Sequence, residues 1–301
     1  MNLIAIFNRD GGTFRTTDMV AYADRAEKIF RDAGHQIECR VVAGKEIVEA
    51  MEKAADEPGV EGLIAGGGDG TISAAASIAW RHGLALGVVP AGTMNLFARS
   101  LKLPLDIFQV LEVLAHGEVL EVDIATANDH SFIHQFSAGM HARMVRYRDS
   151  MNFASRLGKI QASTRAALGV VFNPPIFEME FRTEGQNGRH KVSAISVSNN
   201  EFGRDALMYA DDLTGGKLGF YLAEPLTPPT AMRLLLDILR GRLKENPAVM
   251  AMTATSIELH FPKRRHDVHC VIDGELLPMA RNVVLKIHAG ELKVLVAPKV
   301  A

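Results

Sequence analysis

The stretch Leu63-Ile64-Ala65-Gly66-Gly67-Gly68-Asp69-Gly70-Thr71 decides the fold of this chain. An apolar run leads directly into glycines that surround one acid, and the small-residue segment 72–79 that follows is typical of a helix. Glycines let backbone N–H groups approach an anion because no Cβ is in the way, and a helix start adds its positive dipole end. A tight turn is the alternative, but three consecutive glycines exceed what turn geometry requires. The stretch therefore predicts a phosphate site.

Length, charge and cysteine content exclude several classes of protein. The 301 residues are 48% hydrophobic, which is enough for a large core, and the net charge of −2 gives no overall attraction for nucleic acid. Two cysteines, Cys39 and Cys270, cannot form a disulfide framework. The start does not have the pattern of a signal peptide, and no run approaches the ~20 apolar residues of a membrane span. We therefore expect a cytoplasmic protein whose membrane contact is at most peripheral.

The first 116 residues alternate between strand and helix patterns. Short apolar runs predict strands at residues 3–7, 36–42, 63–67 and 84–89, and helical spacing predicts helices at 17–33, 46–55, 72–82 and 104–116. This alternation favours a doubly wound α/β domain with a mostly parallel sheet. Ligands of such sheets bind at the carboxyl ends of the strands. We expect three loops to converge there: 8–13, 66–71 and 91–95.

The pattern changes near residue 121. Beyond it lie eight apolar or alternating runs that predict strands, at 132–136, 177–181, 192–197, 218–222, 257–261, 268–272, 283–287 and 292–296. Two helices are predicted, at 155–172 and 230–243. This part is therefore expected to be a mainly antiparallel, sandwich-like β domain. We place the α/β domain at 1–124 and the β-rich domain at 125–301, whose last strand can return to the first domain.

Four motifs in this order resemble the diacylglycerol kinase catalytic domain family, and in particular its bacterial lipid kinases. They are Gly66–Thr71, Pro90–Arg99, Val122-Asp123 and Asp273-Gly274-Glu275. NAD kinases share only the first motif. The resemblance implies ATP-dependent phosphorylation of a lipid hydroxyl, with Mg²⁺ as the metal and with the nucleotide between an α/β domain and a β-rich domain.

The resemblance assigns most nucleotide-binding residues to the first domain. They are Asn8, Gly12, Gly66, Gly67, Gly68, Asp69, Gly70, Thr71, Thr93 and Asn95. The negative charge of Asp69 would repel a phosphate unless a cation lay between them, so we expect Asp69 to hold Mg²⁺ directly or through water. The loop from Asn8 departs from the family pattern because Arg9 stands where proline is usual.

Two acids are candidates for catalysis. Glu275, in a turn after a glycine, is expected to be the general base that takes the proton of the acceptor hydroxyl. The alternative is a solvated acid of a β-hairpin turn. Asp123 is expected to position Mg²⁺ or Glu275, and a strand-end cap is its alternative.

Two departures from the family affect the metal. Leu96 stands where the family often has an acid, and Gly215 stands at the acid of a second, structural Mg²⁺ loop. Asp211 or Asp212 can compensate, and Asp212 is the predicted ligand. A kinase of a soluble compound such as NAD, and a catalytically silent nucleotide- or lipid-binding regulator, therefore stay open as alternatives.

The region Arg143–Arg165 combines basic residues with an apolar helical stripe. Such a pattern suits an anionic membrane surface, whereas a core-packed helix with a charged outer face is the alternative. The expected partners are thus ATP and a lipid at a membrane, without nucleic acid, and a homodimer is left open.

Overall fold

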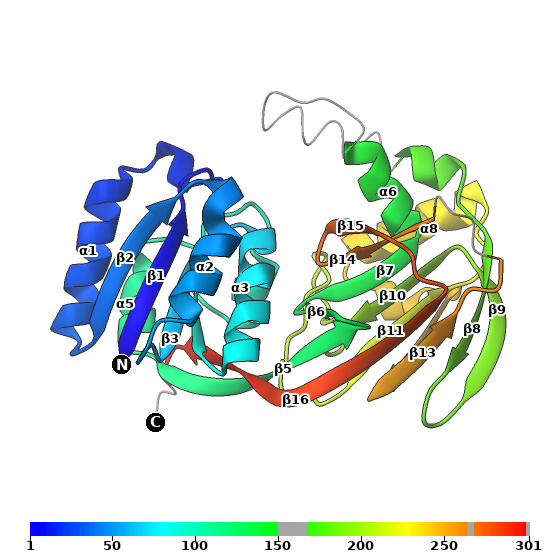
Figure 1. The fold of residues 1–301 in the computed structure, drawn as a ribbon. Coiled ribbons are helices and arrows are strands. Elements are labelled where there is room, and N and C mark those ends of the chain that lie inside the picture. Colours follow the sequence, from blue (N-terminus) through cyan, green and yellow to red (C-terminus); the bar gives the residue numbers. More distant parts are fainter. Residues whose placement is uncertain (150–167, 264–267, 299–301) are drawn as a thin grey trace. The chain divides into compact units, whose positions relative to one another are not determined.

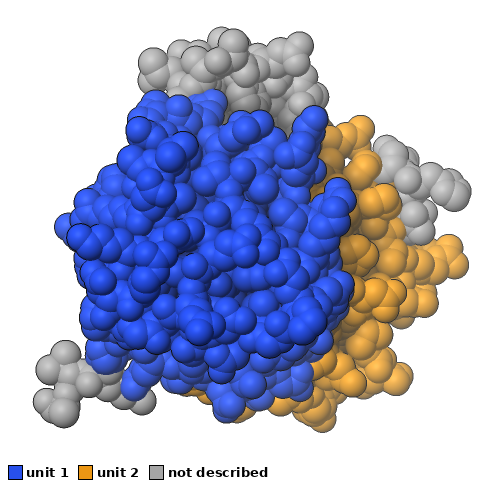
Figure 2. Space-filling view, turned by 60° about the vertical axis from the view of Figure 1, so that its left-hand side comes forward, with its two compact units in different colours: residues 1–124, 289–301 blue, residues 125–288 orange. Residues whose placement is uncertain are grey.

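The computed structural model describes residues 1–149, 168–263 and 268–298 (Figure 1). The chain divides into two compact units, which Figure 2 shows in different colours. Unit 1 comprises Met1–Ile124 and Ala289–Ala301, and unit 2 comprises Ala125–His288. No helix in the described ranges is both long and apolar enough to cross a membrane.

Unit 1 is built on a parallel sheet in the strand order β2-β1-β3-β4. Helices α1 and α5 pack together on one face of the sheet, and α2 and α3 pack together on the other (Figure 1). The elements are β1 (Asn2–Asn8), α1 (Met19–Asp32), β2 (Gln36–Val42), α2 (Ile47–Ala55), β3 (Gly62–Gly67), α3 (Asp69–His82), β4 (Ala85–Pro90), α4 (Leu96–Ser100), α5 (Gln109–Ala115) and the first part of β5 (Glu118–Ala127). Short 3-10 helices lie at Phe14–Thr16 and Gly44–Glu46. The predicted doubly wound α/β fold is confirmed.

The central strands of unit 1 are buried on both faces. Every residue of β3 and of β4 is buried, as expected for parallel strands covered by helices on both sides. Helix α1 begins after Asp18, whose carboxylate accepts from Val20 N and Ala21 N. The predicted start at Thr17 was one residue early, because the Thr17 hydroxyl donates to the Thr13 carbonyl instead.

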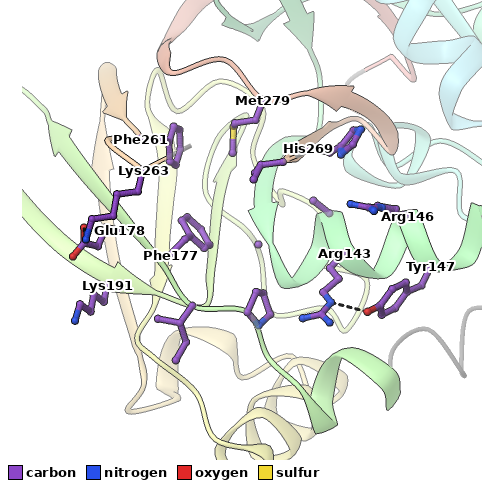
Figure 3. A pocket seen from close by; sticks show the side chains of 15 residues that line it. Arg143, Arg146, Tyr147, Phe177, Glu178, Lys191, Phe261, Lys263, His269 and Met279 are labelled. Atoms are coloured by element: carbon purple, nitrogen blue, oxygen red, sulfur yellow. Dashed lines mark hydrogen bonds and ion pairs between the residues drawn. The ribbon is translucent and has the colours of Figure 1, made fainter. Parts of the chain in front are cut away.

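Unit 2 is a β-rich unit in which two sheets enclose a hydrophobic core. One sheet is antiparallel in the order β12-β11-β10-β7-β14-β15. In the other, the first part of β16 pairs with β13, followed by β8 and β9. The elements are β6 (His130–Phe132), β7 (Gln135–Gly139), α6 (Met140–Asp149), β8 (Phe177–Arg182), β9 (Asn187–Val192), β10 (Ala194–Ser198), β11 (Leu218–Ala223), α8 (Pro228–Leu239), β12 (Val249–Ala254), β13 (Ser256–His260), β14 (His269–Ile272), β15 (Glu275–Pro278) and β16 (Asn282–Val296), with a 3-10 helix at Leu243–Glu245. Phe136, Phe220 and Leu285 are among the residues of the shared core. A cavity described below lies beside α6 (Figure 3).

Four sequence predictions need correction or fall outside the described residues. The run 132–136 is not one strand, because the chain turns at residues 133–134 between β6 and β7. The two strands predicted at 283–287 and 292–296 are a single strand, β16, which begins in unit 2 and ends in unit 1 beside β4. Helix α5 is shorter than the predicted 104–116, because the Asp106 carboxylate accepts from Phe108 N and Gln109 N at its start. Of the helix predicted at 155–172, only 168–172 are described, and these are helical.

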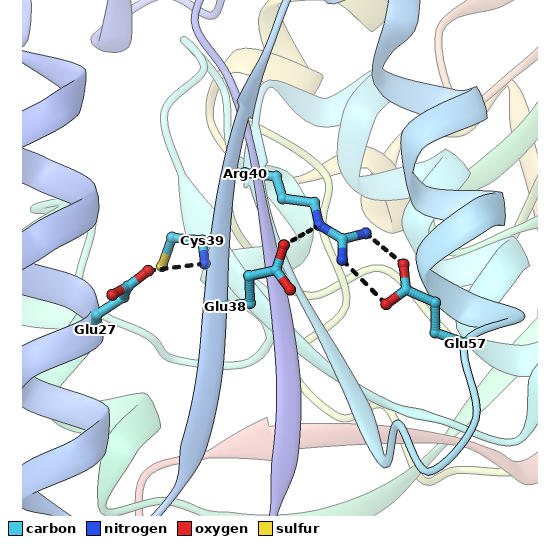
Figure 4. Close-up of polar contacts among 5 residues, drawn as sticks. All are labelled: Glu27, Glu38, Cys39, Arg40 and Glu57. Carbon is cyan, nitrogen blue, oxygen red and sulfur yellow. Dashed lines mark hydrogen bonds and ion pairs between the residues drawn. The ribbon is translucent and has the colours of Figure 1, made fainter.

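Charged side chains protect the outer strand β2 (Figure 4). Arg40 binds both carboxylate oxygens of Glu57, at 2.6 and 3.0 Å, and also Glu38 at 2.6 Å. Hydrogen bonds from Arg40 hold the pKa of both carboxyls below the usual range. Cys39 N donates to Glu27, and burial together with that carboxylate raises the pKa of the Cys39 thiol to about 12. Charges along an edge strand oppose pairing with another chain.

Candidate active site

Hydrogen bonds join the three strand-end loops of unit 1. Thr13 N donates to the Ala91 carbonyl at 2.9 Å, which ties the loop after β1 to the loop after β4. Ala91 N donates to the Gly67 carbonyl at 2.9 Å, and Asn8 Nδ2 donates to Thr71 Oγ1 at 3.3 Å. The loops that the sequence predicts at the strand ends therefore lie against one another.

Close packing explains three of the glycines. A Cβ on Gly66 would lie 2.6 Å from Phe7 Cδ1, and a Cβ on Gly67 would lie 2.6 Å from the Thr71 side chain. Both glycines are buried residues of β3. A Cβ on Gly92 would lie 2.6 Å from the Cα of Gly68. These glycines allow the loops to approach, whereas the backbone that can face a phosphate begins at Gly68.

The start of α3 offers backbone N–H groups to an anion. Gly68 is the N-cap residue and is extended, and the first intrahelical bond runs from Ile72 N to the Gly68 carbonyl at 3.1 Å. The N–H groups of residues 69–71 precede this bond and have no acceptor within the helix. Gly70 is exposed, and no heavy atom lies within 4 Å of where its Cβ would be. A helix of 14 residues adds the positive end of its dipole at this point.

Asp69 connects this helix start to the loop after β4. Its Oδ1 accepts from Leu96 N at 2.7 Å, and its Oδ2 accepts from Asn95 N at 3.1 Å. Asn95 has a positive φ of 52°, and its own Oδ1 accepts from Gly92 N at 2.9 Å. The Asp69 carboxylate thus caps the N-terminus of α4 from a distance. Sequence reasoning missed this role because α4 is five residues long and begins 27 positions further along the chain.

The residues present fit a Mg²⁺ ion that is shared with phosphate oxygens. Each Asp69 oxygen accepts one of these N–H bonds and retains acceptor capacity. Mg²⁺ is usually bound by one or two carboxylates together with phosphates and waters, so a single carboxylate can suffice. Among the described residues, no group of three or more His, Cys, Asp or Glu side chains could hold a metal by itself.

The other two acids predicted to serve the metal or catalysis, Asp123 and Asp212, do not lie in the strand-end loops of unit 1. Asp123 is inside β5, rather than at a strand end as expected; it is 1% exposed, and its Oδ1 accepts from Gly290 N at 2.9 Å. It therefore joins β5 to β16 within unit 1. Asp212 is exposed in unit 2, where its Oδ1 accepts from both Thr214 N and Thr214 Oγ1, at 2.8 and 2.7 Å. The catalytic role of Asp123 and the metal-binding role of Asp212 both stay predictions.

Glu275 is the first residue of β15, directly after the hairpin turn Asp273-Gly274. Both turn residues have positive φ, 46° and 88°, as a type I′ turn requires. The Asp273 carboxylate accepts three backbone N–H groups, from Ile133, His134 and Gln135, at 2.9 to 3.0 Å. The turn is therefore held to the β6–β7 connection, and the side chain of Glu275 is exposed next to it.

The predicted site residues are thus divided between the units. The loops of unit 1 bring together one group, namely Asn8, Gly12, Gly66, Gly67, Gly68, Asp69, Gly70, Thr71, Thr93 and Asn95. Thr93 is exposed in the turn between Gly92 and Asn95. Glu275 and Asp212 lie in unit 2, on different elements.

Comparison with known proteins shows which proteins this chain is similar to. Residues 2–127 match the model of the diacylglycerol kinase catalytic domain. A Yersinia enterocolitica protein named "Probable lipid kinase YegS-like" is 29% identical over 266 residues, 84% of each chain. The uncharacterised protein sll0036 of Synechocystis is 26% identical over 77% of this chain, and the match spans only 55% of that protein's length.

A solved structure shares the fold. The structure of a diacylglycerol kinase from Bacillus anthracis strain Sterne aligns with a TM-score of 0.72 at 16% identity, and covers 100% of this chain and 98% of that one. Residues 2–127 therefore resemble the diacylglycerol kinase catalytic domain, and the whole chain shares the fold of the Bacillus anthracis structure.

Proposed function

We propose that this protein is an ATP-dependent lipid kinase that transfers the γ-phosphoryl group to a lipid hydroxyl. The observation that supports this most is the open N-terminus of α3, with the loops after β1 and β4 bonded around it. Phosphoryl transfer needs fixed phosphates, neutralised charge and an in-line hydroxyl more than covalent help from the protein. The name of the Yersinia relative favours a lipid as the acceptor.

Unit 1 supplies the nucleotide contacts in this proposal. The N–H groups of residues 69–71 bind phosphate oxygens, and Thr93 adds a hydroxyl from the loop after β4. The Asp69 carboxylate would hold Mg²⁺, which when bound would supply neutralisation of the charge on the transferred group. The Asp69 carboxylate therefore has two roles, because it also orients the loop from Gly92 to Leu96.

Glu275 is the proposed general base. Its carboxylate is exposed on a hairpin tip that Asp273 fixes through three hydrogen bonds, so it can approach a hydroxyl without rearrangement of the turn. A carboxylate within hydrogen-bond reach of the acceptor hydroxyl takes the proton as the new P–O bond forms. In this proposal Asp123 supports the strand β16 rather than the proton transfer.

We also propose that the protein takes its lipid from a membrane surface. Phe172 and Ile176 are 66% and 58% exposed, beside the basic helix α6. Large exposed apolar side chains together with cations suit an anionic bilayer. Of the region Arg143–Arg165 that the sequence suggests, residues 150–165 lie outside the described part. Failure to co-sediment with anionic vesicles at low salt would contradict the membrane proposal.

The decisive experiment is phosphoryl transfer from γ-labelled ATP with Mg²⁺ and a panel of lipid alcohols. We expect label in a lipid product, and almost none with the Glu275→Gln variant. A parallel reaction contains NAD without lipid or detergent. Transfer only in that reaction would favour the soluble-acceptor alternative, and ATP binding without any transfer would favour a silent regulator.

A further inference from the structure

Unit 2 contains a cavity of about 810 Å³ that is lined by α6, β8, β9 and the hairpin of β14 and β15. Pockets that hold small ligands have about 300–1,000 Å³. The floor is apolar: Phe177 from β8, Phe261 after β13 and Met279 after β15 lie at its centre (Figure 3). Phe261 and Met279 are buried. Such a floor suits a hydrocarbon chain.

Basic side chains lie on both sides of this floor. Figure 3 shows Lys191 and Lys263 on one side, and Arg143 and Arg146 of α6 on the other. Among the described residues, the lining contains one carboxylate, Glu178. Its charge is already balanced by Lys263 Nζ at 2.9 Å and by Arg189, at 3.5 Å, on the neighbouring strand β9. The cavity therefore carries an excess of positive charge, to which Lys191 and Arg143 contribute.

Arg143 is fixed in position at the cavity wall. Its Nε donates to the Tyr147 hydroxyl at 2.9 Å, and its NH1 donates to the Asn173 carbonyl at 3.0 Å. The guanidinium carbon also lies 5.3 Å from the centroid of the Tyr147 ring, as a cation–π contact. Among the bonds to described residues, these use two of the five N–H donors of a guanidinium. A pre-positioned guanidinium loses little entropy when it binds a phosphate or carboxylate.

The same hairpin carries Glu275 at its other end. His269 lines the cavity at the start of β14, and Ile272, three residues further, pairs with Glu275. Three residues of a strand span about 10 Å, so a lipid headgroup can lie between the cavity and Glu275. Helix α6 covers this hairpin, since Ala142 and Val145 pack on Val271 and Leu276.

We infer that this cavity binds an acidic amphiphile: its chain packs on the Phe177, Phe261 and Met279 floor, its anionic group binds Arg143, and the charge of Lys191 across the floor adds to the attraction. The inference rests on the proposed function, because it assigns the acceptor to the acidic lipids, with a phosphate-type group near the reactive hydroxyl. Neutral lipid alcohols lack the group that these cations recognise.

Binding of single amphiphile molecules tests the inference without a membrane or ATP. The probes are dodecyl phosphate, dodecylphosphocholine and monododecanoylglycerol, below their critical micelle concentrations, with calorimetric titration of the whole chain. We expect dodecyl phosphate to bind at least about tenfold more tightly than the two other probes at low salt, and this preference to shrink as salt rises. Equal affinities, or tighter binding of the neutral probe, would overturn the inference.

Two lysines of unit 2 provide a matched pair of variants. Lys191 is exposed at the cavity, so Lys191→Gln should weaken dodecyl phosphate binding by roughly three- to tenfold and leave the neutral probe unchanged. Lys286, exposed on β16, is not among the cavity residues, so Lys286→Gln should bind as the unmodified chain does. Thermal midpoints of both variants check that they fold. A Lys191→Gln variant that folds and binds normally would remove Lys191 from the site and overturn the inference.

A transfer reaction separates this inference from the proposed function. Monoacyl phosphatidylglycerol and monoacylglycerol are compared as acceptors with ATP and Mg²⁺. Preference for the acidic acceptor supports both proposals, whereas preference for the neutral acceptor overturns the inference and leaves the kinase function intact. If neither acceptor is labelled, the kinase function fails for them, and the binding experiment still decides whether the cavity takes an acidic amphiphile.

Discussion

Substitution of Asp69 by asparagine tests whether this residue is a structural link as well as a metal ligand. The Asp69 carboxylate accepts from Leu96 N at 2.7 Å and from Asn95 N at 3.1 Å. An asparagine retains one oxygen acceptor but turns an NH₂ group toward the second backbone N–H. The variant therefore loses one of the two charge-assisted hydrogen bonds, and its NH₂ group faces a backbone N–H, which is also a donor.

The expected cost follows from these contacts. A hydrogen bond to a charged group contributes about 1.5–3 kcal/mol to stability, so we expect Asp69→Asn to lower the free energy of unfolding by about 2 kcal/mol. For a chain of this size, 1 kcal/mol shifts the thermal midpoint by about 2–4 °C, which gives a decrease of about 4–8 °C. A residue whose role is limited to Mg²⁺ would cause no decrease in the absence of metal and nucleotide.

Thermal unfolding without metal or nucleotide, together with hydrogen exchange at the amides of Asn95 and Leu96, measures this effect. In the variant, exchange should become faster at whichever of these two amides faces the new NH₂ group, because that N–H loses its acceptor. Asp24→Asn is the matched control, since Asp24 is exposed on α1 of the same unit, and its midpoint should stay unchanged. An unchanged midpoint and unchanged exchange in Asp69→Asn would refute the structural role, even if transfer were abolished.

Four further predictions concern single residues. Gly92→Ala should weaken ATP binding at least about tenfold by calorimetry, because its Cβ would lie 2.6 Å from the Gly68 Cα and force the loops apart. Glu275→Gln should lower kcat by about 10²–10⁴-fold in the transfer assay with an unchanged thermal midpoint, and a normal kcat would exclude it as the base. Asp273→Asn should cost about 1–3 kcal/mol in urea unfolding, because three N–H groups share its carboxylate. In urea unfolding, Arg40→Gln should lower the stability of the protein slightly at pH 7 but not at pH 3. Arg40 lowers the pKa of the Glu38 and Glu57 carboxyls in the folded state (Figure 4). The stabilisation from these two carboxylates is therefore present above their unfolded pKa of about 4.3, and it is lost as the pH falls through the lower folded pKa.

Local sequence patterns were sufficient for most elements of unit 1. β2 begins and ends where the alternating run 36–42 predicted, and α2 differs from its prediction by one residue. In these elements, the spacing of apolar residues agrees with the residues that typically begin or end a helix or strand. The pattern was insufficient for β16, since the polar residues near Gly290 suggested a break, whereas one strand continues through them.

The division of the run 132–136 illustrates what a local pattern cannot contain. Its five residues include Phe132, Ile133 and Phe136, which suit a strand. The chain nevertheless turns within it, because Asp273, more than 130 positions away, accepts the N–H groups of three successive residues. A hydrogen bond between distant segments leaves no mark on the local pattern of either segment.

The sequence by itself determined the α/β class of the first part, the β-rich class of the second, and the glycine stretch at which a phosphate is expected. Apolar periodicity and glycine content act over a few residues, so they can be interpreted without a structure. Only the tertiary structure decided that Gly66 and Gly67 are glycines for packing, and that Asp69 caps α4. It alone assembled the basic, apolar-floored cavity of unit 2 from segments that are separate in the sequence. These features depend on distances between residues far apart in the chain, which only the folded backbone fixes.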